Sequence, residues 1–219
     1  MKKLLILIVL ISQYTFADSP LTSTDFYKSY MDVPLVQNAL NSKGKITNEM
    51  MVFINSETNP LEIKLAIINA IGWNVKGNKS SKLYFKFVMN KKKYKSDFGG
   101  DSTAFNWNAT ADELICYAYM KALDNYFDVT DAFEVAGLAL KKNPNSFAVN
   151  MIYNLIKAQG LTAFGESCYA SKTFSTLKNN PKLTMDMKNE AMSFIFEYMD
   201  DIVHIPVILT TQFQFKVTT

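Results

Sequence analysis

The sequence predicts a mainly α-helical fold of stacked antiparallel helical hairpins, arranged as an irregular bundle or a short solenoid, with a short C-terminal β element. Three observations favour this fold. Helix-capping signals recur along the whole chain. Short polar turns separate the helical stretches, and such turns join antiparallel neighbours. Alternating apolar residues then close the chain, as is typical of a strand.

The composition is that of a globular protein. The chain has 219 residues, of which 48% are hydrophobic and 20% charged, enough for one domain with a sizeable core. All 23 basic residues are lysine. Because arginine supplies the planar fork that reads guanine and grips phosphate, its absence disfavours sequence-specific binding of nucleic acid. No apolar run approaches the roughly 18 residues that span a bilayer.

The first 17 residues have the layout of a secretory signal peptide. Lys2 and Lys3 give a positive start, Leu4–Ile11 is an unbroken apolar run, and Ala17 is a small residue at the cleavage position. We therefore expect an exported protein, periplasmic or secreted, whose mature form is a single helical domain over residues 18–219. Its net charge would be close to neutral, which favours neither anionic membranes nor polyanions as partners. A buried N-terminal helix is the alternative.

Local signals place the first helices of the mature chain. Thr47 can cap a short helix that ends near Asn55. Asn59 and Pro60 open the next helix, because proline is favoured at the first helical position, and Gly72 ends it. This second helix is apolar nearly all round, so we expect it to be buried on most sides.

Residues 81–95 carry two conflicting signals. Apolar residues alternate from Leu83 to Met89 as in a strand, whereas Ser80 and Ser81 can cap a helix. The helical neighbours on both sides favour the helix.

The second half of the chain is predicted to contain five helices. Thr110 opens the first of them with a capping box, Thr-Ala-Asp-Glu. On the helix that follows Asn145, a wide apolar arc stands opposite a polar arc of Asn150, Asn154 and Lys157, as is typical of a helix with one solvent face. The five expected ranges are 110–126, 130–142, 145–159, 166–178 and 184–204.

The spacing of two helix ends suggests a repeat. Asn-Pro pairs begin at residues 143 and 180, which are 37 residues apart and close to the period of helical-hairpin repeats. The stretch Ala139–Ser146 resembles the junction between two tetratricopeptide repeats. The resemblance covers this junction alone, because the Trp, Gly and Tyr positions of that repeat are not matched around it. It implies stacked helical hairpins.

The C-terminus has a different pattern from the rest of the chain. Phe213, Phe215 and Val217 alternate with polar residues, and residues 205–209 are rich in β-branched side chains. These features predict two short strands at about 205–218.

Standard catalytic motifs are absent from the sequence. It contains no Gly-rich phosphate loop, nucleophile elbow, paired-histidine zinc helix or Cys-X-X-Cys. The single histidine, His204, excludes mechanisms that need two. Catalysis by carboxylates alone has no sequence signature, so a carboxylate-based hydrolase acting on cell-wall or glycan substrates is the alternative to a binding protein.

Four residues near the end of the last predicted helix form a candidate site for a divalent cation. Glu197, Asp200, Asp201 and His204 fall on one polar side of the helix, where i,i+3 and i,i+4 spacings bring side chains together. Three carboxylates at a helix C-terminus oppose the macrodipole, and a bound cation would relieve that repulsion. A solvated polar face is the alternative, and no other cofactor is indicated.

Cys116 and Cys168 are the only cysteines. Export to an oxidising compartment would allow them to form a disulfide. Two buried thiols that behave as small hydrophobic residues are the alternative.

The segment 90–109 is the strongest candidate for binding. It is predicted as a long connection between helices, and connections of more than about 12–15 residues are usually functional or disordered. Lys93 lies in a lysine cluster at its start, and Phe98, Phe105 and Trp107 follow around a Gly-Gly pair. Such rings can anchor a protein partner or stack on a sugar. Packing of the rings onto the helical core as a lid is the alternative.

These features together favour an exported, non-catalytic module that binds a protein or peptide. An inhibitor or immunity-type protein directed against a secreted enzyme fits this description. Nucleic acid is not an expected partner, and no membrane-spanning segment is expected after cleavage of the signal peptide.

Overall fold

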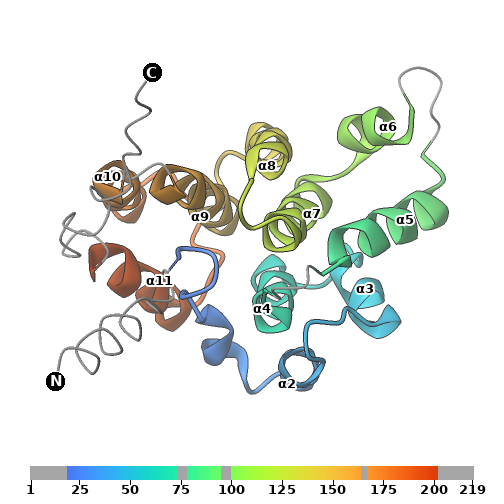
Figure 1. Cartoon of the computed structure of the whole chain (residues 1–219), viewed down its shortest axis with the longest axis horizontal. Helices are drawn as coiled ribbons and strands as arrows, with labels where there is room; N and C mark the ends of the chain where they lie inside the picture. The colour runs from blue at the N-terminus through green and yellow to red at the C-terminus, as the bar shows by residue number, and fades with distance from the viewer. Residues whose placement is uncertain (1–18, 74–77, 95–99, 164–166, 202–219) are drawn as a thin grey trace, which may run out of the picture.

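The computed structural model describes residues 19–73, 78–94, 100–163 and 167–201 (Figure 1). The elements within them are η1 (Phe26–Tyr30), α2 (Pro34–Asn41), α3 (Asn48–Ile54), α4 (Leu61–Ile71), α5 (Ser80–Lys92), α6 (Gly100–Asn108), α7 (Ala111–Asp124), α8 (Thr130–Lys142), α9 (Phe147–Ala163), α10 (Ser167–Lys178) and α11 (Asn189–Asp201).

The described chain is mainly helical, which confirms the predicted fold class at that level. No strand occurs among the described residues, where the β pairing is limited to an isolated bridge between Ser146 and Thr184. The expected signal peptide at 1–17 and the strands expected at 205–218 both lie outside this part of the chain.

Helix α4 lies at the centre of the packing, with η1, α2, α3 and α7 against it (Figure 1). Every residue from 64 to 71 is buried, as the apolar character of this helix predicts. Lys64 is the charged exception, and its ammonium pairs with the Asp112 carboxylate of α7 at 2.8 Å. The helix ends at Gly72, whose φ of 70° is accessible to glycine with little strain.

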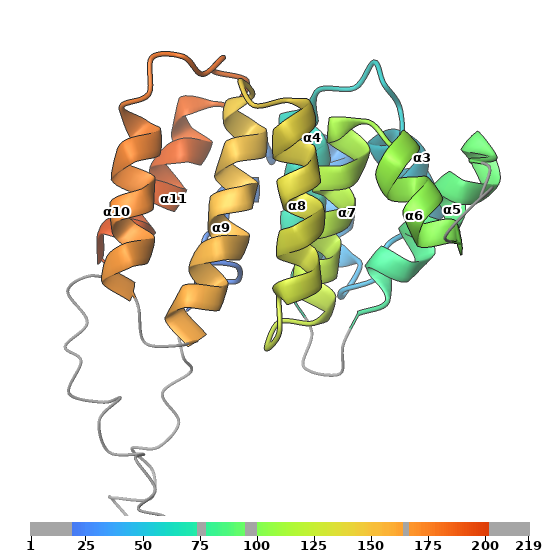
Figure 2. The ribbon, with the colours of Figure 1, turned by 90° about the horizontal axis from the view of Figure 1, so that it is seen from above.

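Helices α7 to α10 follow one another as packed neighbours. Helix α8 packs on α7, α9 on α8 and α10 on α9, and the chain runs alternately up and down through them (Figure 2). The capping box predicted at Thr110 is present, with the Thr110 side chain accepting from the Glu113 amide and the Glu113 carboxylate accepting from the Thr110 amide. Helix α9 continues past the predicted stop at Gly160 to Ala163.

Helix η1, near the start of the described chain, connects the N-terminal helices with the last helix. Helix η1 packs against both α4 and α11. The Tyr30 hydroxyl donates to the Glu62 carboxylate at 2.8 Å, and the backbone N–H of Lys188 donates to the same carboxylate at 2.9 Å. This shared acceptor links η1, α4 and the start of α11.

Residues 80–92 form helix α5, so the helical alternative for this segment is confirmed. Its buried residues Tyr84 and Val88 follow helical spacing. The backbone N–H groups of Ser80 and Ser81 donate to the Asp124 carboxylate at the end of α7, at 3.2 and 2.8 Å. Burial raises the pKa of Asp124, and the hydrogen bonds from Ser81 oppose that rise.

The prediction of a long connection over residues 90–109 is wrong, because residues 100–108 form helix α6. Phe105 supports this helix by packing onto the rings of Phe85 and Tyr117. The Lys142 ammonium of α8 donates to the carbonyls of Trp107 and Ala109 at 2.9 and 2.6 Å. Carbonyls at the C-terminal end of α6 thereby gain a hydrogen-bond donor.

The last helix begins later than the predicted Thr184. The Thr184 carbonyl accepts from the Phe147 amide at 3.0 Å, and the Asp186 carboxylate accepts from the Ala148 amide at 2.8 Å. These residues therefore cap α9, and the helical hydrogen bonds of α11 begin only at Asn189.

Candidate functional site

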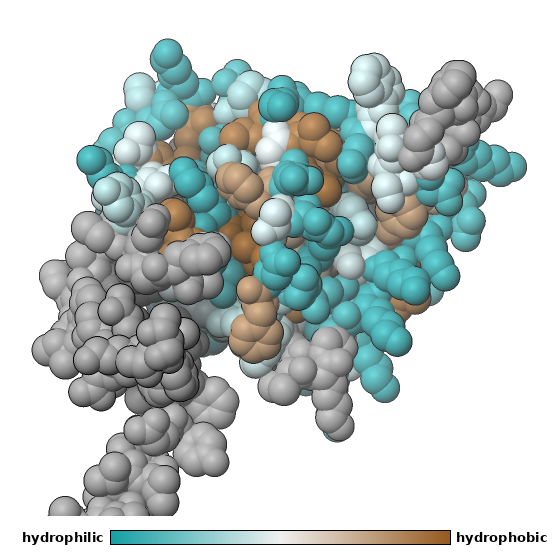
Figure 3. Space-filling model, turned by 45° about the horizontal axis from the view of Figure 1, so that its top comes forward, coloured by the Kyte–Doolittle hydropathy of each residue, from teal (hydrophilic) through white to brown (hydrophobic). Residues whose placement is uncertain are grey.

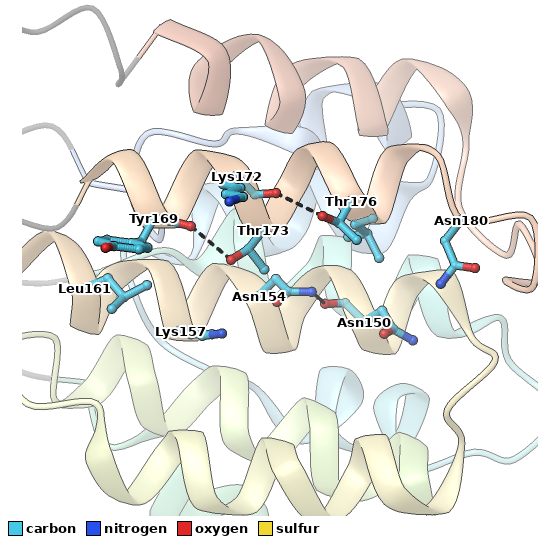
Figure 4. Close-up of a pocket in the computed structure, with 10 residues that line it drawn as sticks. Asn150, Asn154, Lys157, Leu161, Tyr169, Lys172, Thr173, Thr176 and Asn180 are labelled. Atoms are coloured by element: carbon cyan, nitrogen blue, oxygen red, sulfur yellow. Dashed lines mark hydrogen bonds between the residues drawn. The ribbon is translucent and has the colours of Figure 1, made fainter.

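An open groove between α9 and α10 is a candidate site in the described part of the chain (Figure 4). Its volume is about 570 Å³. The residues that line it are Asn150, Asn154, Lys157, Leu161, Tyr169, Lys172, Thr173, Thr176, Leu177 and Asn180.

The spacing of the lining residues explains how two helices form one groove. On α9 they lie four, three and four residues apart, from Asn150 to Leu161, so they share a single face. The opposite face of α9, which includes Met151 and Leu155, is fully buried in the core. The polar stripe of α9 thus becomes one wall, and the facing side of α10 becomes the other (Figure 4).

Backbone contacts hold several of the lining side chains in place. The Asn154 amide donates to the Asn150 carbonyl at 2.9 Å, and the hydroxyls of Thr173 and Thr176 donate to carbonyls of their own helix at 3.0 and 3.2 Å. The Asn150 amide donates to the carbonyls of Pro144 and Ser146. Asn150, Thr173 and Thr176 use their N–H and O–H hydrogens internally, so their oxygens are available to accept hydrogen bonds from a ligand.

Two lysines bring positive charge to the groove from opposite walls. Lys157 lies on α9 and Lys172 on α10 (Figure 4). Within the described part of the chain, neither ammonium has a hydrogen-bond or ion-pair partner, whereas Lys64, Lys92 and Lys188 are all paired with carboxylates. The ring of Tyr169, which is 67% exposed, lies beside Leu161 at one end of the groove.

The chemistry of this lining suits recognition. The described lining contains ammonium, amide, hydroxyl and phenol groups and no carboxylate or imidazole. Carboxylate-based hydrolysis, the alternative function, needs a pair of acidic groups that flank the scissile bond. The described lining does not supply such a pair.

The residues predicted for binding lie apart from the groove, because α6 and α10 are at opposite sides of the molecule (Figures 1 and 2). Trp107 is displayed, with 83% of its surface exposed. Lys93 is also exposed, just after α5. Phe105 is fully buried, so its expected role as a displayed anchor is replaced by packing in the core. Phe98 lies outside the described residues.

The surface is otherwise largely hydrophilic in the view of Figure 3, with apolar residues visible between polar ones. Trp107 and Phe127 are the most exposed large apolar side chains among the described residues, at 83% each. Phe127 packs edge-on against Tyr126, with the ring centroids 5.2 Å apart.

The predicted cation site is described only in part. Glu197, Asp200 and Asp201 are exposed on α11, and His204 lies outside the described residues. Glu197 and Asp200 line a smaller pocket, of about 310 Å³, beside the apolar ring of Phe196. Among the described residues no three acidic, histidine or cysteine side chains are grouped closely enough to hold a metal ion.

The two cysteines lie on α7 and α10. Cys116 is fully buried and has no disulfide partner among the side chains that the structure describes. Burial raises the pKa of the Cys116 thiol well above its usual range, and the neighbouring Asp112 carboxylate adds to the rise. The side chain of Cys168 lies outside the described set, so the disulfide stays a prediction.

Comparisons with known proteins identify no relative of this chain. No protein-family model, curated protein or solved structure matches the chain. None of the described helices has the length and apolar character needed to cross a membrane.

The sequence predicts the polar residues of the α9 wall but does not indicate that they belong to a groove. The polar arc of Asn150, Asn154 and Lys157 was predicted as a solvent face. The opposing wall from α10 was not anticipated, although one signal was present. Residues 135–185 contain six lysines and a single acidic residue, Glu166.

Proposed function

We propose that this protein is an exported, non-catalytic module that binds an extended segment of a protein partner in the groove between α9 and α10. The groove itself carries the proposal, because it combines a volume of about 570 Å³ with hydrogen-bonding groups on both walls. Binding sites of this size typically combine apolar surface with a few placed polar groups. An inhibitor or immunity-type protein would use such a groove to hold a segment of its target.

The order of the helices supports this proposal. The pairs α7–α8 and α9–α10 begin at Ala111 and Phe147, about one hairpin-repeat length apart. We infer that they stack as a short solenoid, in which each hairpin contacts only its neighbours and leaves an extended surface for ligands. The groove lies within the second hairpin of this stack.

Filling the groove with a large side chain is expected to abolish binding. Thr173 lines the groove from α10, so Thr173→Trp should place an indole in the space that a ligand needs. Ser175→Trp is the matched control, because Ser175 is exposed on the same helix and is not part of the lining. Peptides selected from a phage-displayed random library on the wild-type protein should bind the Ser175→Trp variant and lose binding to Thr173→Trp.

Circular dichroism of both variants checks that the helices are intact. Equal binding of the selected peptides to both tryptophan variants would mean that the groove is not the binding site.

Export is the second part of the proposal, and the mature chain is expected to begin at Asp18. The structure supports this starting point in one respect: Ser19 and Leu21 are already buried, and the Ser19 hydroxyl donates to the Gln159 side chain of α9. Intact-mass measurement of natively expressed protein should show the loss of residues 1–17. A folded product that keeps Met1 would contradict cleavage.

A further inference from the structure

The charge around the groove differs from that of the whole chain. The complete chain has 23 lysines and 20 acidic residues, so its formal net charge is only +3. Residues 135–185, which include both groove helices, contain six lysines and one acidic residue. The near-neutral balance of the whole chain therefore conceals a locally basic surface, and local charge steers association more than the total does.

Lys157 and Lys172 concentrate this local charge within the groove. They approach from opposite walls, and no described carboxylate neutralises either one. An ammonium without an intramolecular partner retains its full capacity for a charge-assisted hydrogen bond to a ligand. The pair is therefore suited to a ligand with at least two negative groups.

The neutral polar groups of the groove indicate which kind of anion fits. The amide of Asn150 and the hydroxyls of Thr173 and Thr176 donate to backbone carbonyls, so they offer mainly oxygens to a ligand. A peptide backbone presents N–H donors to such oxygens. A phosphodiester backbone presents only acceptors, and it would leave these oxygens without partners.

We propose that the groove binds an extended acidic stretch of polypeptide, with its carboxylates paired to Lys157 and Lys172 and its backbone N–H groups bound by the amide and hydroxyl oxygens of the walls. This ligand class rests on the proposed function of the groove as a peptide-binding site. Successive side chains of an extended peptide point in opposite directions. Neighbouring acidic residues can therefore reach the lysines of the two walls.

Fluorescence anisotropy with labelled octapeptides tests the ligand class directly. An octapeptide of glutamate is expected to bind the wild-type protein at least about tenfold more tightly than an octapeptide of glutamine, and its affinity should fall as sodium chloride is raised. The Lys157→Glu/Lys172→Glu variant is expected to bind the glutamate peptide at least about tenfold more weakly.

A second double variant separates a specific site from general attraction. Lys141 and Lys182 are exposed, belong to the same basic segment and do not line the groove. Lys141→Glu/Lys182→Glu makes the same change in net charge and should retain most of the affinity. An equal loss in both double variants would overturn the proposal, because it would show attraction to the basic surface as a whole.

The remaining outcomes separate the ligand class from the proposed function. Equal affinity for the glutamate and glutamine peptides, with both lost in Thr173→Trp, would overturn the acidic ligand and leave the peptide groove in place. Tighter binding of a single-stranded oligonucleotide, sensitive to the Lys157→Glu/Lys172→Glu change, would also overturn it in favour of nucleic acid. If the glutamate peptide does not bind at millimolar concentration, the acidic ligand is ruled out. The phage selection still tests separately whether the groove binds peptides.

Discussion

Truncating Phe105 to alanine is expected to lower the free energy of unfolding by about 3–5 kcal/mol, as for a large aromatic residue in a core. The Phe105 side chain is fully buried. Its ring centroid lies 5.3 Å from that of Phe85 and 5.1 Å from that of Tyr117. Removing the ring would leave a cavity among α5, α6 and α7 that the surrounding helices can fill only in part.

Trp107, two residues further along α6, is the matched control. Its side chain is 83% exposed, so Trp107→Ala should change the free energy of unfolding by no more than about 0.5 kcal/mol. Urea denaturation followed by circular dichroism measures both variants. Similar losses of stability in the two would contradict the division between a buried and a displayed ring.

The same pair of variants separates packing from recognition on α6. If Trp107→Ala keeps its stability as expected, any loss of partner binding in that variant can be assigned to the missing indole. Exposed tryptophans are frequent hot spots in interfaces, where truncation costs about 2 kcal/mol or more of binding energy. Trp107 and Lys93, both exposed, therefore remain proposed contacts, separate from the groove.

Helix starts with a local cap could be predicted from the sequence. The capping box at Thr110 joins residues three apart, and the Thr47 side chain accepts from the Met50 amide three residues on. Such contacts are visible in any short window of sequence. They explain why α3 and α7 begin close to their predicted positions.

Helix starts that depend on distant residues could not be predicted in this way. The amides at the start of α5 bind the carboxylate of Asp124, more than 40 residues later in the chain. The start of α9 is held by Asp186, which delays the onset of α11. Helix α6 is stabilised in part by Lys142 of α8. In each case the deciding partner is brought close only by the completed fold.

The groove illustrates the same division. The polar stripe on α9 follows from helical periodicity, so its existence could be predicted from the positions of Asn150, Asn154 and Lys157. Which helix faces that stripe depends on how α10 packs, and periodicity carries no such information. The scarcity of acidic residues along 135–185 was visible in the sequence and could have drawn attention to both helices.

The Glu113 carboxylate is a shared acceptor for several side-chain and backbone donors. Only 3% of its surface is exposed. One carboxylate oxygen accepts from the Asn55 amide at 2.8 Å and lies 3.6 Å from the Lys92 ammonium. The other accepts from the Tyr94 hydroxyl and the Thr110 backbone N–H, both at 2.9 Å. A single carboxylate thus connects α3, α5 and α7.

Replacing Glu113 by alanine is therefore expected to cost about 3–5 kcal/mol of stability, because it leaves the donors of Asn55, Tyr94 and Thr110 without their acceptor. The Lys92 ammonium keeps its partner Glu57, at 2.6 Å. Glu113→Gln should be destabilising too, since an amide of the same shape presents an NH₂ group where only acceptors fit. Glu134→Ala on α8 is the control, because Glu134 is exposed and should change stability by no more than about 0.5 kcal/mol. Urea titration of the three variants gives the comparison. A Glu113→Gln variant as stable as the wild type would show that the negative charge and its acceptor geometry are not needed at this junction of helices.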